Sequence, residues 1–153
     1  MVWQLAAGGA VSLLNFFIHA IMTALIMVGT RRTAAATDEL HFVVRLVALL
    51  TVTVSVLSFA HVLEIFIWTA LYEALDIAPE EGISAFEFAF ENYTALGYGD
   101  PVPPSNLRLF GPMTALNGLL LIGWSVFVIF EVMRMAEIRF QRAEPLSGNK
   151  EPQ

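Results

Sequence analysis

Three long apolar segments constrain the fold of this chain more than any other feature. They lie at residues 5–29, 41–72 and 110–135, and a helix of about 20 apolar residues is long enough to cross a bilayer. Hydrophobic residues make up 57% of the 153 residues and charged residues 14%, which is too apolar for an ordinary soluble domain. The sequence therefore predicts an all-α membrane protein with three transmembrane helices.

Basic residues gather in two places, and the positive-inside rule converts these positions into an orientation. They surround the first connection and follow the third span, as Arg31, Arg32, Arg45, Arg134, Arg139, Arg142 and Lys150. The connection after the second span is acidic, with Glu73, Asp76, Glu80 and Glu81. We therefore expect a multi-pass protein of the plasma or inner membrane, with its N-terminus outside and a cytoplasmic tail at 136–153. Aromatic residues favour the membrane interface, and Trp3, Trp68 and Tyr72 are expected at the outer one.

The region 83–104, between the second and third spans, has the pattern of a re-entrant loop. Residues 84–93 predict a helix too short to cross a bilayer, and Thr94-Ala95-Leu96-Gly97-Tyr98-Gly99-Asp100 follows. Non-helical backbone at membrane depth is tolerated only where protein or water satisfies its polar groups. Glycines on both sides of a tyrosine allow right- and left-handed conformations to alternate. Successive carbonyl oxygens can then point one way and replace the water around a cation.

This run resembles the selectivity filter of potassium channels, whose usual form is Thr-Val-Gly-Tyr-Gly-Asp. The resemblance covers roughly residues 83–130 and is strongest at the last four residues of the run, 97–100. It implies that four copies of the chain surround one pore, with membrane lipids around them, and that K⁺ is the permeant ion. It further implies that K⁺ is bound by the backbone carbonyls of Ala95, Leu96, Gly97 and Tyr98. A potassium-selective channel that conducts passively is therefore expected, with no cofactor.

Two residues depart from the usual filter sequence. Ala95 stands where the family has a second threonine, and Leu96 stands where it has valine. Backbone carbonyls survive both changes, but a ring of hydroxyl oxygens facing the cavity is lost. A weakly selective or non-selective cation channel therefore remains open as an alternative.

Glu91 lies nine residues before Asp100, where several bacterial channels resembling this chain carry a glutamate behind the filter. By that resemblance the two carboxyl groups share a proton or a water, because two like charges are not easily buried together. The alternative is that Glu91 faces solvent in an outer vestibule.

The third span contains a segment, 123–127, that resembles the pore-lining helix of the same channels. Trp124, Phe127 and Glu131 are spaced to share one helix face. On a pore-lining face Glu131 would form an acidic ring, and the two aromatic rings would narrow the cavity. Gly123 and Gly118 are competing gating hinges, although small residues in membrane helices also permit close packing. Crowding by the aromatic rings leaves open a non-conducting, channel-like protein for assembly or sensing.

Ionisable residues within the first two spans form a second candidate site. His61 and Glu64 lie one helical turn apart, and Asn15 and His19 fall at similar depth in the first span. A hydrogen-bonded cluster between the two spans is the conservative interpretation. A proton sensor or a metal site is the alternative, because histidine titrates near neutral pH and binds zinc together with glutamate.

Other functions find no support in the sequence. There is no cysteine, no Lys/Arg cluster of the kind that binds nucleic acid, and no nucleotide-binding or hydrolase motif. We therefore do not expect an enzyme. Arginines do not recur every third residue in any span, and the tail is too short for a soluble ligand-binding domain. The gating stimulus is left open.

Overall fold

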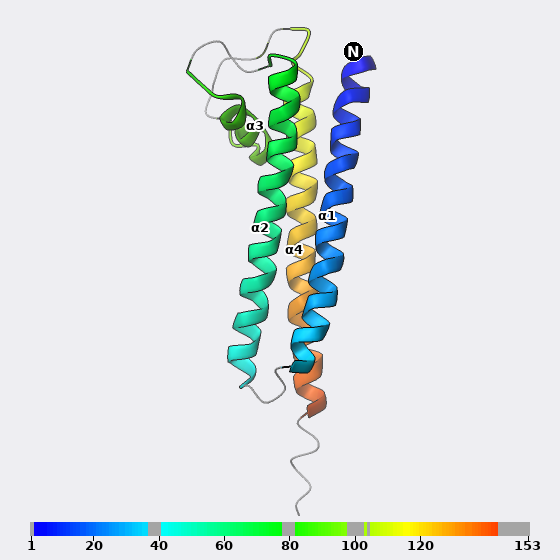
Figure 1. Cartoon of the computed structure of the whole chain (residues 1–153), viewed down its shortest axis with the longest axis vertical. Coiled ribbons are helices and arrows are strands. Elements are labelled where there is room, and N and C mark those ends of the chain that lie inside the picture. The colour runs from blue at the N-terminus through cyan, green and yellow to red at the C-terminus, as the bar shows by residue number, and fades with distance from the viewer. Residues whose placement is uncertain (1, 37–40, 78–81, 98–102, 104, 144–153) are drawn as a thin grey trace, which may run out of the picture.

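The computed structural model describes residues 2–36, 41–77, 82–97, 103 and 105–143. Over these residues the chain forms four helices and no strand. The helices are α1 (Val2–Ala36), α2 (Phe42–Ala74), α3 (Ala85–Thr94) and α4 (Phe110–Ala143). The long helices α1, α2 and α4 lie side by side, and the short helix α3 lies near one end of the bundle beside α2 (Figure 1). The all-helical class expected from the sequence is confirmed.

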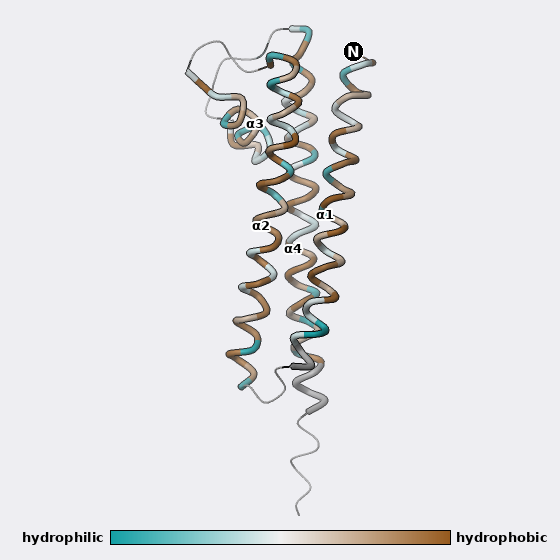
Figure 2. Tube along the Cα trace, in the orientation of Figure 1, coloured by the Kyte–Doolittle hydropathy of each residue, from teal (hydrophilic) through white to brown (hydrophobic). Residues whose placement is uncertain are grey.

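The three long helices are apolar and long enough to cross a membrane. They contain 35, 33 and 34 residues, so each is about 50 Å long at a rise of about 1.5 Å per residue. The hydrocarbon core of a bilayer is only about 30 Å thick, so each helix extends beyond it. Hydrophobic residues cover most of the length of the bundle (Figure 2).

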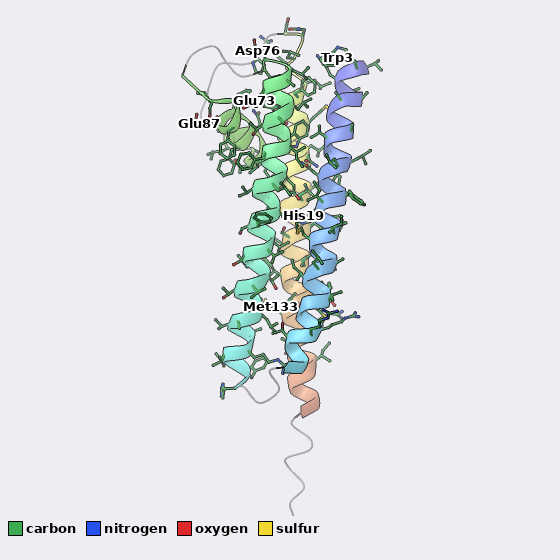
Figure 3. All side chains as sticks on the ribbon, in the orientation of Figure 1. Trp3, His19, Glu73, Asp76, Glu87 and Met133 are labelled. Atoms are coloured by element: carbon green, nitrogen blue, oxygen red, sulfur yellow. The ribbon has the colours of Figure 1, made fainter. Side chains whose placement is uncertain are left out.

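The two ends of the bundle carry different charges. The start of α1 and the short helix α3 lie at one end (Figure 1). Glu73, Asp76 and Glu87 lie at that same end, together with Trp3 (Figure 3). Arg31 and Arg32 lie near the end of α1, and Arg45 lies in the first turn of α2, so these basic residues belong to the opposite end. We call the end that carries α3 the acidic end and the other end the basic end.

Helix α4 has one buried and one exposed face. Its buried residues recur every three or four positions, at Phe110, Thr114, Asn117, Leu121, Ser125, Val128, Val132 and Ala136. The opposite face is apolar but exposed on the single chain, with Leu116, Leu119, Leu120, Phe127 and Phe130. A period of 3 to 4 residues is that of an α-helix with one face against a core. The polar residues of this buried face therefore need partners on the neighbouring helices.

Helix α3 begins with a capping box, in which the first and fourth residues bond to each other's backbone. The Ser84 hydroxyl accepts a hydrogen bond from the Glu87 backbone N–H at 3.2 Å, and the Glu87 carboxylate accepts one from the Ser84 backbone N–H at 2.9 Å. These contacts satisfy two backbone donors that a helix start leaves open. The backbone hydrogen bond from Ser84 holds the pKa of Glu87 below its ordinary value. Helix α3 is therefore fixed at its first turn by the capping residue Ser84, in addition to its apolar contacts.

Candidate functional site

The first part of the filter-like run follows directly from the end of α3. Thr94 is the last residue of α3, and the structure describes Ala95, Leu96 and Gly97 after it. Tyr98, Gly99 and Asp100 lie outside the described residues, as do Glu80 and Glu81. Ala95 and Gly97 have positive φ angles of 56° and 55°, and Leu96 between them does not. Over these three residues the sign of φ therefore alternates.

Two backbone hydrogen bonds close the end of α3. The Ala95 N–H donates to the Asn92 carbonyl and the Leu96 N–H donates to the Glu91 carbonyl, both at 3.0 Å. This pair of bonds around a left-handed residue is a Schellman motif, whose left-handed position usually carries glycine. An L-residue there costs about 1–2 kcal/mol, and a β-branched residue is more strained than alanine. The local backbone thus gives a physical reason for Ala95 in place of the family's threonine.

Glu91 is half-buried and lies beside a groove of about 470 Å³ on α3. Gly82, Ile83, Glu87, Phe90, Thr94 and Leu96 also line this groove. The Thr94 hydroxyl donates back to the Phe90 carbonyl at 3.0 Å. The predicted partner of Glu91, Asp100, lies outside the described residues, so their pairing stays a prediction.

Gly118 on α4 lies directly beneath the end of α3. A Cβ atom at Gly118 would lie 1.9 Å from the Tyr93 carbonyl oxygen, which is far inside any van der Waals contact. Helices α3 and α4 can therefore cross at this point only because Gly118 has no side chain. A Cβ at Gly123, by contrast, would have no described atom within 4 Å. Close packing accounts for Gly118, whereas the hinge interpretation of Gly123 stays a prediction.

The three residues expected to share a face of α4 have different surroundings. The Trp124 ring lies against α1, with its centroid 5.6 Å from that of His19 and 6.5 Å from that of Phe16. The Phe127 side chain is 64% exposed and lies with the apolar exposed face. Glu131 accepts two hydrogen bonds from Arg134, at 2.7 and 2.9 Å, on the same helix. Of the three residues, Phe127 is therefore the one whose side chain is exposed and has no ring contact or ion pair among the described residues.

Glu64 is the centre of a buried polar cluster to which every helix contributes. Its carboxylate lies 2.9 Å from His19 Nδ1 and 3.1 Å from His61 Nδ1, and it accepts the Tyr93 hydroxyl at 2.5 Å. The Nε2 atoms of the two imidazoles both face the Ser125 hydroxyl, at 2.9 Å from His61 and 3.3 Å from His19. We call these five residues the Glu64 cluster. His19 lies near the middle of the bundle (Figure 3).

A second polar layer lies one helical turn closer to the acidic end. The Asn117 side-chain oxygen accepts hydrogen bonds from Asn15 Nδ2 at 3.0 Å and from Trp68 Nε1 at 2.9 Å. Asn15 Nδ2 also lies 3.3 Å from the Glu64 backbone carbonyl, and the Tyr72 hydroxyl bonds to Thr114 at 2.9 Å. This layer connects α1, α2 and α4.

The structure brings together the four polar residues singled out from the sequence. His19, His61 and Glu64 meet in one cluster, and Asn15 lies in the adjoining layer. Sequence reasoning missed Tyr93, Ser125 and Asn117. The signal for the last two was their spacing of eight residues on one face of α4, which two polar residues in an apolar span rarely share by accident.

Two of the three aromatic residues expected at the outer interface face the interior of the bundle. Trp68 and Tyr72 are 0% exposed and face the core of the bundle, where each donates or shares a hydrogen bond with α4. Trp3, 49% exposed, is the one of the three that stays at the surface. The polar group of a tryptophan or tyrosine ring can bond to a polar partner inside a bundle as well as to water at the membrane interface.

Comparison with protein families identifies the class of the chain. The family model for ion channels matches residues 49–135, which is more than half of the chain. It describes a two-span channel domain of the potassium-channel type. The chain therefore belongs to the ion-channel family, and with its three apolar helices it is a multi-pass membrane protein. The match begins within α2, so α1 lies outside it. Searches of curated proteins and of solved structures gave no match.

Proposed function

We propose that this chain forms a homotetrameric, potassium-selective channel. The observation that carries the proposal is the backbone at the end of α3. In this ion-channel chain the short helix ends at Thr94. The sign of φ then alternates over Ala95, Leu96 and Gly97, in the filter-like run. Such alternation aligns carbonyl oxygens that can replace the hydration shell of K⁺.

The placement of α3 supports a role as a pore helix. It is 10 residues long, too short to span a bilayer, and it packs against both α2 and α4. The C-terminus of a helix carries partial negative charge, which stabilises a nearby cation. In the proposed assembly four such helix ends surround the ion path, and the carbonyls of Ala95, Leu96, Gly97 and Tyr98 coordinate the ion.

The exposed face of α4 supports assembly through this helix. One chain supplies one filter-like run, so a closed pore needs several copies. The apolar face that contains Leu116, Leu120 and Phe127 has no cover on the single chain. In the tetramer this face would turn towards neighbouring copies and the pore. The positive-inside rule would put the basic end in the cytoplasm and the acidic end, with α3 and the N-terminus, outside.

A weakly selective cation channel is the second candidate, and Ala95 favours it. This position has a left-handed backbone and no hydroxyl group, so the innermost ion site has only carbonyl oxygens. The non-conducting alternative has less support, because it assumed that the Trp124 ring obstructs the pore. The Trp124 ring packs against Phe16 and His19 on α1.

Planar-bilayer recording of the purified protein tests the proposal. With concentrated KCl on one side and a more dilute mixture of KCl and NaCl on the other, the reversal potential should approach the potassium equilibrium potential. A smaller reversal potential of the same sign would support the weakly selective channel. A reversal potential of opposite sign, which follows chloride, or no current at all, would contradict both. Ala95→Gly keeps the left-handed backbone without a Cβ and is the matched control for Ala95→Thr. Cross-linking in native-like lipid should give a four-chain species.

A further inference from the structure

We propose that the Glu64 cluster is a binding site for a divalent transition metal, with Zn²⁺ the best match. Ligand atoms of His19, His61 and Glu64 lie within 4.8 Å of one another, and the three residues come from two helices. The Tyr93 hydroxyl on α3 adds a fourth donor, 2.8 Å from His61 Nδ1 and 2.5 Å from the Glu64 carboxylate. This inference does not rest on potassium selectivity.

The spacing of the four donors suits a tetrahedral ion. Zinc binds nitrogen and oxygen at about 2.0–2.2 Å, which puts the ligands of a tetrahedral site roughly 3.3 Å apart. His19 Nδ1 lies 2.9 Å from one oxygen of the Glu64 carboxylate, and His61 Nδ1 lies 3.1 Å from the other. One ligand atom from each of the three residues lies within 4.8 Å of the other two, so the side chains would close around the ion when it binds. A donor set of two imidazoles and a carboxylate binds zinc in preference to magnesium or calcium, which favour oxygen ligands.

The two imidazole rings share one hydroxyl group at their Nε2 atoms. If both Nδ1 atoms donate to the Glu64 carboxylate, neither Nε2 atom of a neutral ring carries a hydrogen. Both Nε2 atoms face the Ser125 hydroxyl, which has only one hydrogen to give, so one ring nitrogen is left as a mismatch in a buried site. The other metal-free arrangement puts the His61 hydrogen on Nε2 and lets its Nδ1 accept from the Tyr93 hydroxyl, 2.8 Å away.

A metal on the two Nδ1 atoms removes this mismatch. Both ring hydrogens then reside on Nε2, and the two lone pairs of the Ser125 oxygen can accept both. Histidines that bind metals characteristically donate their other N–H to an oxygen in this way. Ser125 therefore lies where it would orient both metal-binding rings.

Charge and access are compatible with the same site. Glu64 supplies one negative charge, which offsets part of the charge of a bound divalent cation. The Glu64 side chain is 0% exposed, whereas that of His61 is 20% exposed and offers an entry route. Because the ligands lie on α1, α2 and α3, bound metal would fix the end of α3 relative to both spans.

Metal binding to the purified tetramer tests the inference without any measurement of ion flux. The protein, made without a histidine tag and stripped with chelator, is titrated with Zn²⁺ by calorimetry and with Co²⁺ by visible absorption. We expect one ion per chain and the intense absorption of four-coordinate Co²⁺. His19→Gln and His61→Gln should weaken binding by more than the roughly 10–100-fold that loss of an outer partner costs.

Two further variants keep the test decisive if a ligand variant fails to fold. Ser125→Ala retains all four ligands and should weaken Zn²⁺ binding by roughly 10–100-fold. His41→Gln changes the one histidine of the chain that is not a proposed ligand. His41 is exposed and lies before α2, so this variant should leave binding unchanged. The inference is overturned if the folded tetramer binds no Zn²⁺, if Co²⁺ stays six-coordinate, or if His61→Gln and His41→Gln bind alike.

Discussion

The two ends of the bundle are held together in different ways. Towards the acidic end, buried polar side chains from four helices bond to one another around Glu64 and Asn117. Towards the basic end, a buried apolar cluster joins the helices, and it comprises Ile26, Leu49, Leu57, Val128, Val132 and Ala136. A groove of about 480 Å³ opens there between α1 and α2.

This difference matters because lipid tails are as apolar as a leucine side chain. Apolar contacts alone therefore give little drive for helices to associate in a membrane, and hydrogen bonds add specificity. The hydroxyls of Thr30 and Thr53, near the basic end, bond to carbonyls within their own helices. We infer that the hydrogen bonds around Glu64 and Asn117 fix the helices of the acidic half, and with them α3, in one arrangement.

Removal of the Glu64 carboxylate should have the largest effect on this arrangement. Glu64→Ala leaves His19, His61 and Tyr93 buried without their common partner. We expect a loss of about 3–5 kcal/mol, the usual cost of breaking a buried charged pair, measured as thermal unfolding of the purified protein in detergent. Thr53→Val, in the basic half, is the control and should change stability little. Equal losses for both variants would refute the contrast between the two halves.

A side chain at Gly118 should have the next largest effect. Gly118→Ala puts a methyl group into the Tyr93 carbonyl, and overpacking of this kind costs about 1–3 kcal/mol. The end of α3 should move, so that both thermal stability and K⁺ selectivity fall. Gly123→Ala is the matched control, since no described atom lies within 4 Å of its new Cβ. If the two variants behave alike, the close crossing of α3 and α4 is not important.

Loss of one hydrogen bond in the second polar layer should have a smaller effect. Trp68→Phe keeps an aromatic ring in the core but removes the donor to Asn117. Hydrogen bonds between membrane helices contribute about 0.6 kcal/mol on average and up to about 1.7 kcal/mol. Unfolding of Trp68→Phe by denaturant in mixed micelles should show a loss in this range, whereas Trp3→Phe should not.

The pH dependence of the α3 start should be the smallest effect. Because the pKa of Glu87 is lowered in the folded chain from its ordinary 4.5, its carboxylate stabilises the capping box above pH 4.5. This contribution is lost as the pH falls through the lowered pKa. Amide hydrogen exchange of residues 85–88 should therefore accelerate on acidification, after correction for the intrinsic rate. Glu87→Gln, which has no carboxylate to titrate, should remove this pH dependence, and its persistence would argue against Glu87 as the cause.

Much of the fold was predictable because apolar runs of membrane length allow few structures. The three spans and the short helix before Thr94 follow from the sequence, and the helices only extend further than expected at their ends. The partners of the buried polar residues were not predictable. Trp68 and Tyr72 are equally suited to an interface, and only the rotation of α2 against α4 turns them inward.

The candidate sites were predictable to different degrees. His61 and Glu64 are one turn apart, so their proximity follows from helix geometry. Their contacts with Tyr93 and Ser125 depend on how α3 and α4 are placed against α2, which no local pattern encodes. The two roles proposed for Gly118 likewise could not be separated until the Tyr93 carbonyl was seen against it.

The central claim is that the contact between α3 and the Glu64 cluster supports potassium selectivity. One recording tests this claim most directly. The reversal potential with concentrated KCl opposite a dilute mixture of KCl and NaCl should be measured for the unmodified protein and for Tyr93→Phe, which removes only the hydroxyl that bonds to Glu64. We predict a reversal potential near the potassium equilibrium potential for the unmodified protein, and one shifted away from it in a variant that assembles to the same size. A reversal potential far from the potassium equilibrium potential for the unmodified protein, or identical potentials for the two proteins, would contradict the claim.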